Sequence, residues 1–390
     1  METSRLALLP RDGFFFKDGR GWYSSASEYG HSLEWPWPST LLGAMRTLWG
    51  RAEEARTGNR FTPRDWREKT EEIFIQRTLA LRRPHAETWN TTHRVWPRPA
   101  DALSLESEAG GMESLDRLDP KPPRGMTLGR DDDAAREALW MPYPEQKRKP
   151  RRGARWWGES AFARWLVGEV PQGEEMREAF NLQRRRQVRV SIDPARHTVS
   201  DGAIFSQDVV EALERDAEWA LGIETNCQIA DDHLATLGSD RRLAYVESLD
   251  DALFAMPMLL RKASVSGSRG LRLVVVTPAC FENGWLPDGF APDGEQYRGR
   301  LRGLEAELIL RSALVDRPIA VSGWDMVAGQ PKQTAQMVSA GAVYFFERAD
   351  ELAFTAAQIE ALWLTALGGR TNEGFGRIVP ALWNPQPNGA

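Results

Sequence analysis

The residues best suited to contact a phosphate form a glycine-rich run near the end of the printed sequence, LGGRTNEGFGRIVP at 367–380. Its glycines let backbone come close to a partner and can direct N–H groups into a concave, anion-accepting loop. Its arginines add forked donors that match phosphate. The residues concerned are Gly368, Gly369, Arg370, Gly374, Gly376 and Arg377.

The order of elements around this glycine loop limits what it can bind. An apolar helical pattern precedes it and a short strand, 375–379, follows it. A dinucleotide site needs the reverse order, in which G-x-G-x-x-G follows a strand and opens a helix. The loop therefore favours a polynucleotide backbone over a nucleotide cofactor, and a plain connector remains the alternative.

A second candidate surface is the start of a helix predicted from WPWPSTLLGAMRTLW at 35–49. Pro38 keeps the preceding chain out of a helix, and Ser39 is a good N-cap. Gly43 weakens the helix unless something packs closely there. Arg46 is placed to reach the helix surface beside the glycine loop. The apolar residues that share one helical face are Leu41, Leu42, Met45, Leu48 and Trp49.

Residues typical of enzyme or metal sites are sparse. The sequence has neither H-E-x-x-H nor G-x-S-x-G, and its histidines are isolated. Cys227 and Cys280 are too few for a disulfide framework or a zinc site, so two thiols in a reducing compartment are favoured over one bridge. We therefore expect no catalytic residue, no metal site and no cofactor. The histidines are His31, His85, His93, His197 and His233.

Length and composition indicate a soluble protein of two or three domains. The chain has 390 residues, of which 42% are hydrophobic. Its mean hydropathy is −0.48, and no apolar run is long enough to span a membrane. The first residues lack the basic and apolar regions of a signal peptide. We expect a cytoplasmic protein without membrane contact.

The charge pattern leaves room for nucleic acid despite a net charge of −5. Only seven of the 50 cationic residues are lysines, so nearly all of them are arginines. Arginine pairs bidentately with phosphate and stacks on bases. A GC-rich genome explains the same excess. Basic runs lie at 147–155 and 184–189, and each is either a solvated face or an RNA contact. The sixteen tryptophans favour core and interface positions over base stacking.

Periodicity predicts an α+β fold. The element order in the second half is close to β-α-β-β-α-β, with the glycine loop between the second helix and the last strand. Residues 97–150 turn to Pro, Gly and acids, which is typical of a mobile insertion. Strands are expected at 6–9, 73–79, 188–192, 219–225, 243–246, 271–277, within 308–322, and at 342–346 and 375–379. Helices are expected from 39, and at 156–167, 250–263 and 355–367.

Seven short elements, in order along the chain, resemble the RAMP proteins of CRISPR systems. The resemblance is to the family of subunit three of the Cmr module, the type III-B effector complex. Gly238, Ser239 and Asp240 stand where that family has G-G-E, and 104–155 matches no family element. The elements are FFKDGR at 15–20, WPSTLLGAMRT at 37–47, WPRPAD at 96–101, LGSDRR at 237–242, SGWD at 322–325, AGAVYFF at 340–346 and the glycine loop.

The resemblance implies two packed ferredoxin-like (RRM-like) units, one at 1–245 with the insertion near 97–150 and one at 246–390. It implies a non-catalytic subunit that holds the 5′ handle of the CRISPR RNA (crRNA) at the foot of the complex. Its neighbours would be the large polymerase-like subunit and a backbone subunit, with target RNA contacted indirectly. The RNA-binding residues expected are Asp18, Arg20, Ser39, Thr40, Gly43, Arg46, His93, Arg94, Gly368, Gly369, Arg370, Asn372, Gly374, Phe375, Gly376 and Arg377.

Two alternatives remain open. His31 precedes the first helix, close to where a histidine is the general base in the RNA-processing members of the superfamily. The resemblance therefore also allows a metal-independent endoribonuclease that activates a 2′-hydroxyl of repeat RNA. The other alternative is a structural scaffold that bridges subunits without touching RNA.

Overall fold

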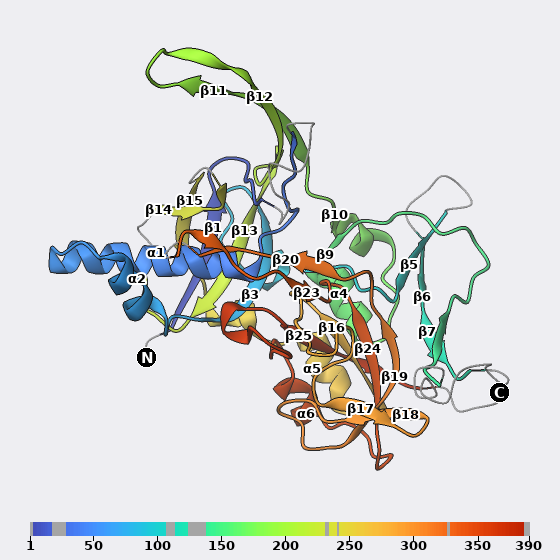
Figure 1. The fold of residues 1–390 in the computed structure, drawn as a ribbon. Helices are drawn as coiled ribbons and strands as arrows, with labels where there is room; N and C mark the ends of the chain where they lie inside the picture. The colour runs from blue at the N-terminus through green and yellow to red at the C-terminus, as the bar shows by residue number, and fades with distance from the viewer. Residues whose placement is uncertain are drawn as a thin grey trace. The chain divides into compact units, whose positions relative to one another are not determined.

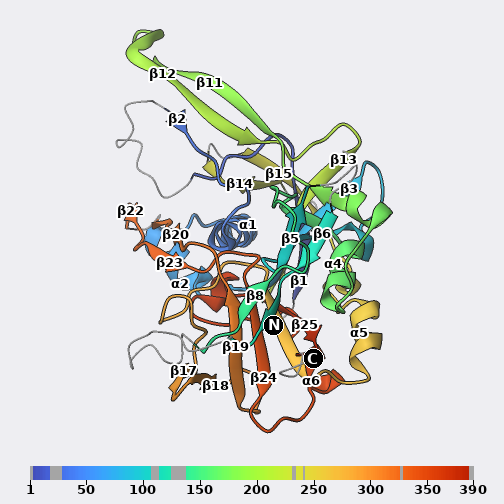
Figure 2. The ribbon, with the colours of Figure 1, turned by 90° about the vertical axis from the view of Figure 1, so that its right-hand side faces the viewer.

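The structure is a computed structural model that describes residues 3–17, 29–106, 114–123, 138–230, 234–239, 242–325 and 328–385. It is an α+β protein, as predicted (Figures 1 and 2). The chain divides into two compact units: unit 1 comprises 1–89, 182–250 and 320–335, and unit 2 comprises 90–181, 251–319 and 336–390. Both units are discontinuous in the sequence, and the predicted division into domains 1–245 and 246–390 stays a prediction.

Unit 1 is built on an antiparallel sheet whose strands run in the order β3-β13-β1-β15-β14. The longest helix, α1 (Pro38–Thr57), connects β1 to β3 and packs on this sheet with its predicted apolar face. A second helix, α2 (Pro63–Thr70), packs on α1. The strands are β1 (Ser4–Pro10), β3 (Ile75–Pro84), β13 (Ala217–Thr225), β14 (Leu234–Leu237) and β15 (Arg242–Ser248).

The start of α1 differs from the prediction. The helix begins at Pro38, and its N-cap is Trp37, which makes no side-chain cap hydrogen bond. Proline is well suited to the first helical position because the N–H it lacks has no partner there. Ser39 therefore lies inside the first turn and is not the cap. A true capping box occurs at α2, where Thr62 and Asp65 bond to each other's backbone N–H.

A long hairpin of unit 1, formed by β11 (Arg184–Asp193) and β12 (Thr198–Val210), extends away from the sheet (Figure 1). The strand at 188–192 was predicted, but its partner β12 was not. At the turn, the carboxylate of Asp193 accepts from the N–H of Ala195, and His197 has a φ of 52°. The short β2 (Tyr29–Gly30) joins β12 in parallel.

Unit 2 carries a second antiparallel sheet, in the order β17-β18-β19-β24-β16-β25. Every residue of β16 (Gly270–Val275) is buried, as its continuous apolar run predicts. The glycine loop lies between α6 (Ala356–Ala361) and β25 (Ile378–Trp383), although α6 is shorter and β25 later than predicted. The other elements are α5 (Met258–Ser264), β17 (Phe290–Asp293), β18 (Gln296–Gly299), β19 (Leu308–Leu314) and β24 (Val343–Arg348).

The described parts of the predicted insertion hold paired strands, with Leu105 and Leu115 buried. Residues 107–113 and 124–137 lie outside the described residues, so the predicted mobility stays a prediction. The strands between residues 90 and 181 are β4 (Arg94–Pro97), β5 (Ala102–Leu105), β6 (Ser114–Arg117), β7 (Asp119–Lys121), β8 (Met141–Tyr143), β9 (Trp156–Gly158) and β10 (Ala179–Phe180), with α4 (Glu159–Leu166) between β9 and β10.

Short elements complete the chain. Single helical turns are η2 (Thr91–His93), η4 (Gly173–Glu178), η6 (Asp251–Phe254) and η7 (Thr371–Glu373); short strands are β20 (Ile319–Val321), β21 (Trp324–Asp325), β22 (Gln330–Pro331) and β23 (Ala335–Met337). Across the described ranges, no helix is both long and apolar enough to cross a bilayer.

Candidate nucleic-acid interface

The glycine loop of unit 2 is closed at its base by backbone contacts. The N–H of Leu367 donates to the carbonyl of Gly376 at 2.9 Å, and Ala366 pairs with Arg377. Gly376 has a φ of 73°, and a Cβ there would lie 1.9 Å from the Leu367 carbonyl oxygen. Gly368 has a φ of 85°, and its Cβ would lie 2.4 Å from the carbonyl oxygen of Cys280. Both positions therefore require glycine to pack the loop on itself.

Several amides that were expected to hold phosphate are used inside the loop. The N–H of Gly369 donates to the carbonyl of Cys280 at 2.7 Å, and that of Gly376 donates to the carbonyl of Pro278 at 2.8 Å. The N–H of Gly374, where φ is 96°, donates to Thr371, and that of Arg377 donates to the hydroxyl of Thr277. The phosphate cradle predicted from these four amides is thus corrected: they stabilise the loop.

The tip of the loop faces solvent. Gly369 and Asn372 are exposed, whereas Phe375 is fully buried beneath the tip. The guanidinium of Arg370 lies 4.7 Å from the centre of the Phe375 ring and donates to both carboxylate oxygens of Glu373, at 2.7 and 2.8 Å. The hydrogen bonds with Glu373 raise the pKa of Arg370, so its charge is retained. The loop thus presents Arg370 and Asn372 on a fixed backbone.

The first turns of α1 in unit 1 expose small and polar residues, at least in part. Ser39 and Thr40 are half-buried, Gly43 is exposed, and a Cβ added at Gly43 would meet no atom within 4 Å. No described residue packs on this glycine. The guanidinium of Arg46 donates to the carbonyls of Glu71 and Ile73 at 3.0 and 3.2 Å. That contact ties α1 to the chain before β3.

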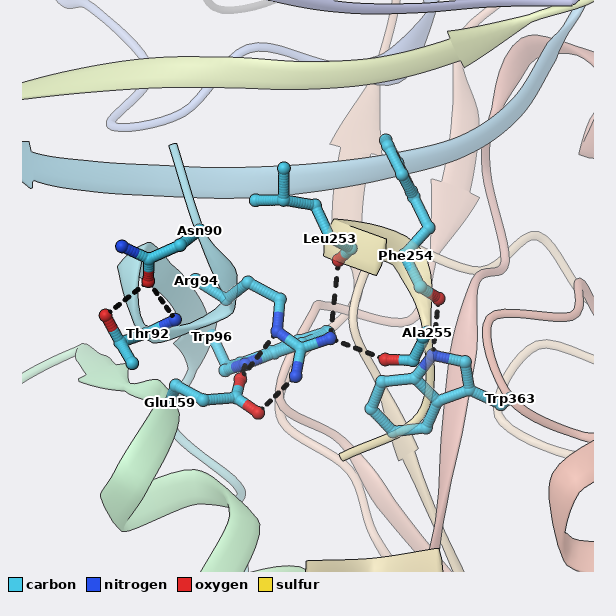
Figure 3. A network of polar contacts seen from close by, with 9 residues as sticks. All are labelled: Asn90, Thr92, Arg94, Trp96, Glu159, Leu253, Phe254, Ala255 and Trp363. Atoms are coloured by element: carbon cyan, nitrogen blue, oxygen red, sulfur yellow. Dashed lines mark hydrogen bonds and ion pairs between the residues drawn. The ribbon is translucent and has the colours of Figure 1, made fainter. Parts of the chain in front are cut away.

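The structure places His93 and Arg94 inside unit 2, and Figure 3 shows the polar contacts of Arg94. Arg94, 2% exposed, donates to both oxygens of Glu159 and to the carbonyls of Leu253 and Ala255. His93 is also buried, and its Nδ1 accepts from the N–H of Asn90 at 3.2 Å. Neither residue faces solvent, so the expected RNA contact is replaced by a structural role.

The same buried network reaches Trp363, in the segment between α6 and the glycine loop. The guanidinium of Arg94 lies 5.7 Å from the ring centre of Trp96 and 6.0 Å from that of Trp363. The indole N–H of Trp363 donates to the carbonyl of Phe254 at 2.9 Å (Figure 3). Burial raises the pKa of the Glu159 carboxyl, which is balanced by Arg94 and by the indole N–H of Trp96. One feature of the sequence pointed to the burial of Arg94: the nearby Trp96, because tryptophan is more often found in a core than on a surface.

The alternative catalytic histidine, His31, lies exposed in unit 1 beside the base of the hairpin. Its Nδ1 is 4.0 Å from a carboxylate oxygen of Asp208, and its ring centre is 4.5 Å from that of Tyr29. The Tyr29 hydroxyl donates to Asp208, which raises the pKa of Tyr29. The 4.0 Å separation is longer than a hydrogen bond, so Asp208 does not orient the imidazole directly.

Two expected contact residues, Asp18 and Arg20, lie outside the described residues. The remaining predicted RNA-binding residues that are at least partly exposed lie at the tip of the glycine loop and in the first turns of α1. These two sets belong to different units. The expectation that they share one RNA segment stays a prediction.

Comparisons with known proteins agree with the resemblance. A family model described as CRISPR-associated protein (Cas_Cmr3) matches residues 6–383. Two solved structures, of the type III-B Cmr-beta complex bound to cognate target RNA without and with AMPPnP, are similar at 10% and 12% identity, respectively. Their TM-scores are 0.43 and 0.42, and the matches cover 89% and 87% of this chain and 86% of each matched chain.

An apo-state structure of the same complex is similar at 11% identity, with a TM-score of 0.25 and 64% of this chain covered against 98% of the other. Among curated proteins, no relative matches the sequence. The family match runs from within β1 to the last residue of β25. The chain therefore belongs to the Cas_Cmr3 family of CRISPR-associated proteins.

Proposed function

We propose that this chain is a non-catalytic RNA-binding subunit of a type III-B Cmr effector complex, in which it holds the 5′ handle of the crRNA. The observation that carries the proposal is the tip of the glycine loop. It presents Arg370 and Asn372 from a backbone fixed by internal hydrogen bonds, in a chain of a CRISPR-associated family. The subunit would serve antiviral defence by RNA-guided targeting of RNA.

Both units are proposed to be ferredoxin-like. The four principal strands of unit 1, numbered along the chain, lie in the order 2-3-1-4 (β3-β13-β1-β15), and those of unit 2 repeat this order (β19-β24-β16-β25). All neighbouring pairs are antiparallel, which the ferredoxin-like arrangement requires. Unit 1 retains the first crossover helix as α1, and unit 2 retains the second as α6.

The chemistry of the tip suits a splayed single strand. Arg370 already makes two parallel donor bonds with a carboxylate, and a phosphate offers the same geometry. The exposed amide of Asn372 has both a donor and an acceptor for a base edge. On α1, the open surface at Gly43 allows a sugar–phosphate backbone to approach the helix closely. Ser39 and Thr40 would add hydroxyl donors there.

The proposal includes neighbours within the complex. The handle would lie at the foot of the complex, next to the large polymerase-like subunit and a backbone subunit, and target RNA would be contacted only through the guide. We propose no RNA cleavage by this chain, because no described residue is hydrogen-bonded to the imidazole of His31 to orient it.

Crosslinking within the assembled complex tests the proposal. A crRNA with 4-thiouridine in the handle, irradiated in the complex, is expected to crosslink to peptides that contain residues 367–377 or 38–47. Placing the photoreactive base in the guide region instead should abolish these crosslinks. Handle crosslinks confined to other subunits would reject the handle role and favour a structural scaffold.

A further inference from the structure

The two basic runs of the chain differ in how their charges are balanced. In the run at 184–189, Arg184 lies 3.7 Å from the carboxylate of Asp208, and Arg185 pairs with Glu211 at 2.5 Å. In the run at 147–152, the side chains of Lys147, Arg151 and Arg152 are exposed and meet no carboxylate among the described residues. In the first run, Arg186 is exposed and has no carboxylate partner among the residues that the structure describes, but it bonds to Ser206 and lies over the ring of Tyr29. The second run presents three exposed cations without a carboxylate partner among the described residues.

The backbone of this second run is held in place. The N–H of Gln146 donates to the buried carboxylate of Asp116 at 2.9 Å. The N–H of Glu106 donates to the carbonyl of Lys149 at 3.0 Å, and the N–H of Arg151 donates to the carbonyl of Ser104 at 2.8 Å. The run thus continues beside β5 like an added strand, and its cations project from an ordered backbone rather than from a flexible tail.

An aromatic side chain precedes the cations. In β8, Met141 is 54% exposed and Tyr143 is 49% exposed, and strand alternation directs both to one face. The strand is anchored through the preceding Trp140, whose carbonyl accepts from the hydroxyl of Ser312 at 2.8 Å. The ring of Tyr143 is therefore a solvent-facing platform on a fixed strand, four residues before Lys147.

We propose that residues 141–152 form a second RNA-binding surface, which takes single-stranded RNA without regard to sequence. Phosphates would pair with Lys147, Arg151 and Arg152, and a base would stack on Tyr143. A basic groove with an aromatic platform is the usual composition of such sites. The surface is separate from the tip of the glycine loop and does not depend on which RNA that tip holds.

RNA fits this surface better than an acidic protein segment does. An acidic protein segment would bind through the cations alone, so it would not explain the exposed ring of Tyr143. Two exposed acids of the described residues adjoin the cations: Glu106 lies 3.4 Å from Lys149, and Glu145 stands between Tyr143 and Lys147 in the sequence. The guanidinium of Arg148 donates to Ser114, Gln146 and the carbonyl of Glu106, and these bonds help to shape the surface.

The test measures binding of a fluorescent oligouridine of about twelve nucleotides, a length suited to a single-stranded site and free of handle sequence. The full chain is compared with Arg151→Ala/Arg152→Ala at 50 and 200 mM salt. Each lost phosphate contact makes the slope of log affinity against log salt concentration shallower by about 0.7. The fourfold rise in salt should therefore weaken RNA binding by the double variant roughly sevenfold less than it weakens binding by wild type. The matched control is Arg51→Ala/Arg64→Ala, which removes two exposed arginines on α1 and α2 and should bind as wild type does.

Tyrosine variants separate stacking from charge. Tyr143→Ala should weaken oligouridine binding about five- to 150-fold, whereas Tyr143→Phe should bind as wild type does, because the ring remains. Unchanged oligouridine binding and salt slope in the arginine variant would overturn the proposal. So would binding of a polyglutamate peptide that is lost in the arginine variant while oligouridine binding is retained, which would identify a protein interface. Neither result bears on handle binding by Arg370 and Asn372.

Discussion

Arg94 and Glu159 form a buried, two-pronged ion pair in unit 2, with Nε and Oε2 2.9 Å apart. The same guanidinium bonds to the carbonyl of Ala255 at 2.6 Å, and Glu159 also accepts from the indole N–H of Trp96. The pair therefore joins β4, α4 and the segment before α5. Arg94, which was expected to contact RNA, therefore lies in the core of unit 2.

Removing Arg94 should destabilise the protein rather than act on RNA. Arg94→Ala leaves the Glu159 carboxylate buried without its counter-ion, which is expected to cost about 3–5 kcal/mol of stability. Arg94→Met/Glu159→Leu removes both charges and fills the space, so it should melt closer to wild type. Thermal melts of both variants measure this. Arg94→Ala with a wild-type melting temperature and weakened RNA binding would contradict the core role.

Sequence patterns predicted the elements whose signals are local. The continuous apolar run of β16 and the one-sided apolar face of α1 correctly indicated a buried strand and a helix packed on a sheet. The strand β12 was missed because its residues mix polar and apolar types while its pairing partner lies across a turn.

The site was less predictable, because its determinants are distant in sequence. Glu159 is 65 residues from Arg94, so no local pattern reveals that the arginine is paired and buried. Glycines at 368 and 376 signal close backbone approach, but the sequence does not say whether a ligand or another part of the chain approaches. Here the approaching atoms are the carbonyls of Cys280 and Leu367.

Replacing loop glycines by alanine should lower the melting temperature at one position and leave it nearly unchanged at another. Gly376→Ala introduces a Cβ that would lie 1.9 Å from the Leu367 carbonyl at positive φ, so the loop must shift and the melting temperature should fall clearly. Gly369→Ala is the matched control, because its Cβ would lie 3.6 Å from the nearest atom without a positive φ. Equal melting temperatures for the two variants would show that the loop is not closed as described.

Helix α1 offers a variant with opposite effects on stability and binding. Gly43→Ala meets open space and should stabilise the helix by about 1 kcal/mol, yet weaken handle binding if RNA backbone approaches there. Ser39→Ala should leave the melting temperature nearly unchanged because Ser39 is not the cap, whereas Thr62→Ala should cost about 1 kcal/mol. Tighter or equal handle binding by Gly43→Ala would exclude α1 from the RNA site.

The proposed lack of catalysis predicts that repeat RNA stays intact. Wild type and His31→Ala, incubated with labelled repeat RNA without metal, should both return full-length RNA on a denaturing gel. Because His31 is exposed, its replacement should not affect folding, so the comparison reports on chemistry. Site-specific cleavage by wild type that disappears in His31→Ala would favour the processing enzyme instead.

The most direct test of the handle-binding claim compares wild type with Arg370→Ala/Asn372→Ala by equilibrium binding. The ligands are handle RNA and a scrambled RNA of equal length and composition. Wild type should prefer the handle, and the variant should lose this preference, with handle affinity reduced roughly tenfold or more through the lost charge-assisted contact. Melting temperatures close to wild type would confirm an intact fold. A folded variant that binds the handle as tightly and as selectively as wild type would contradict the account.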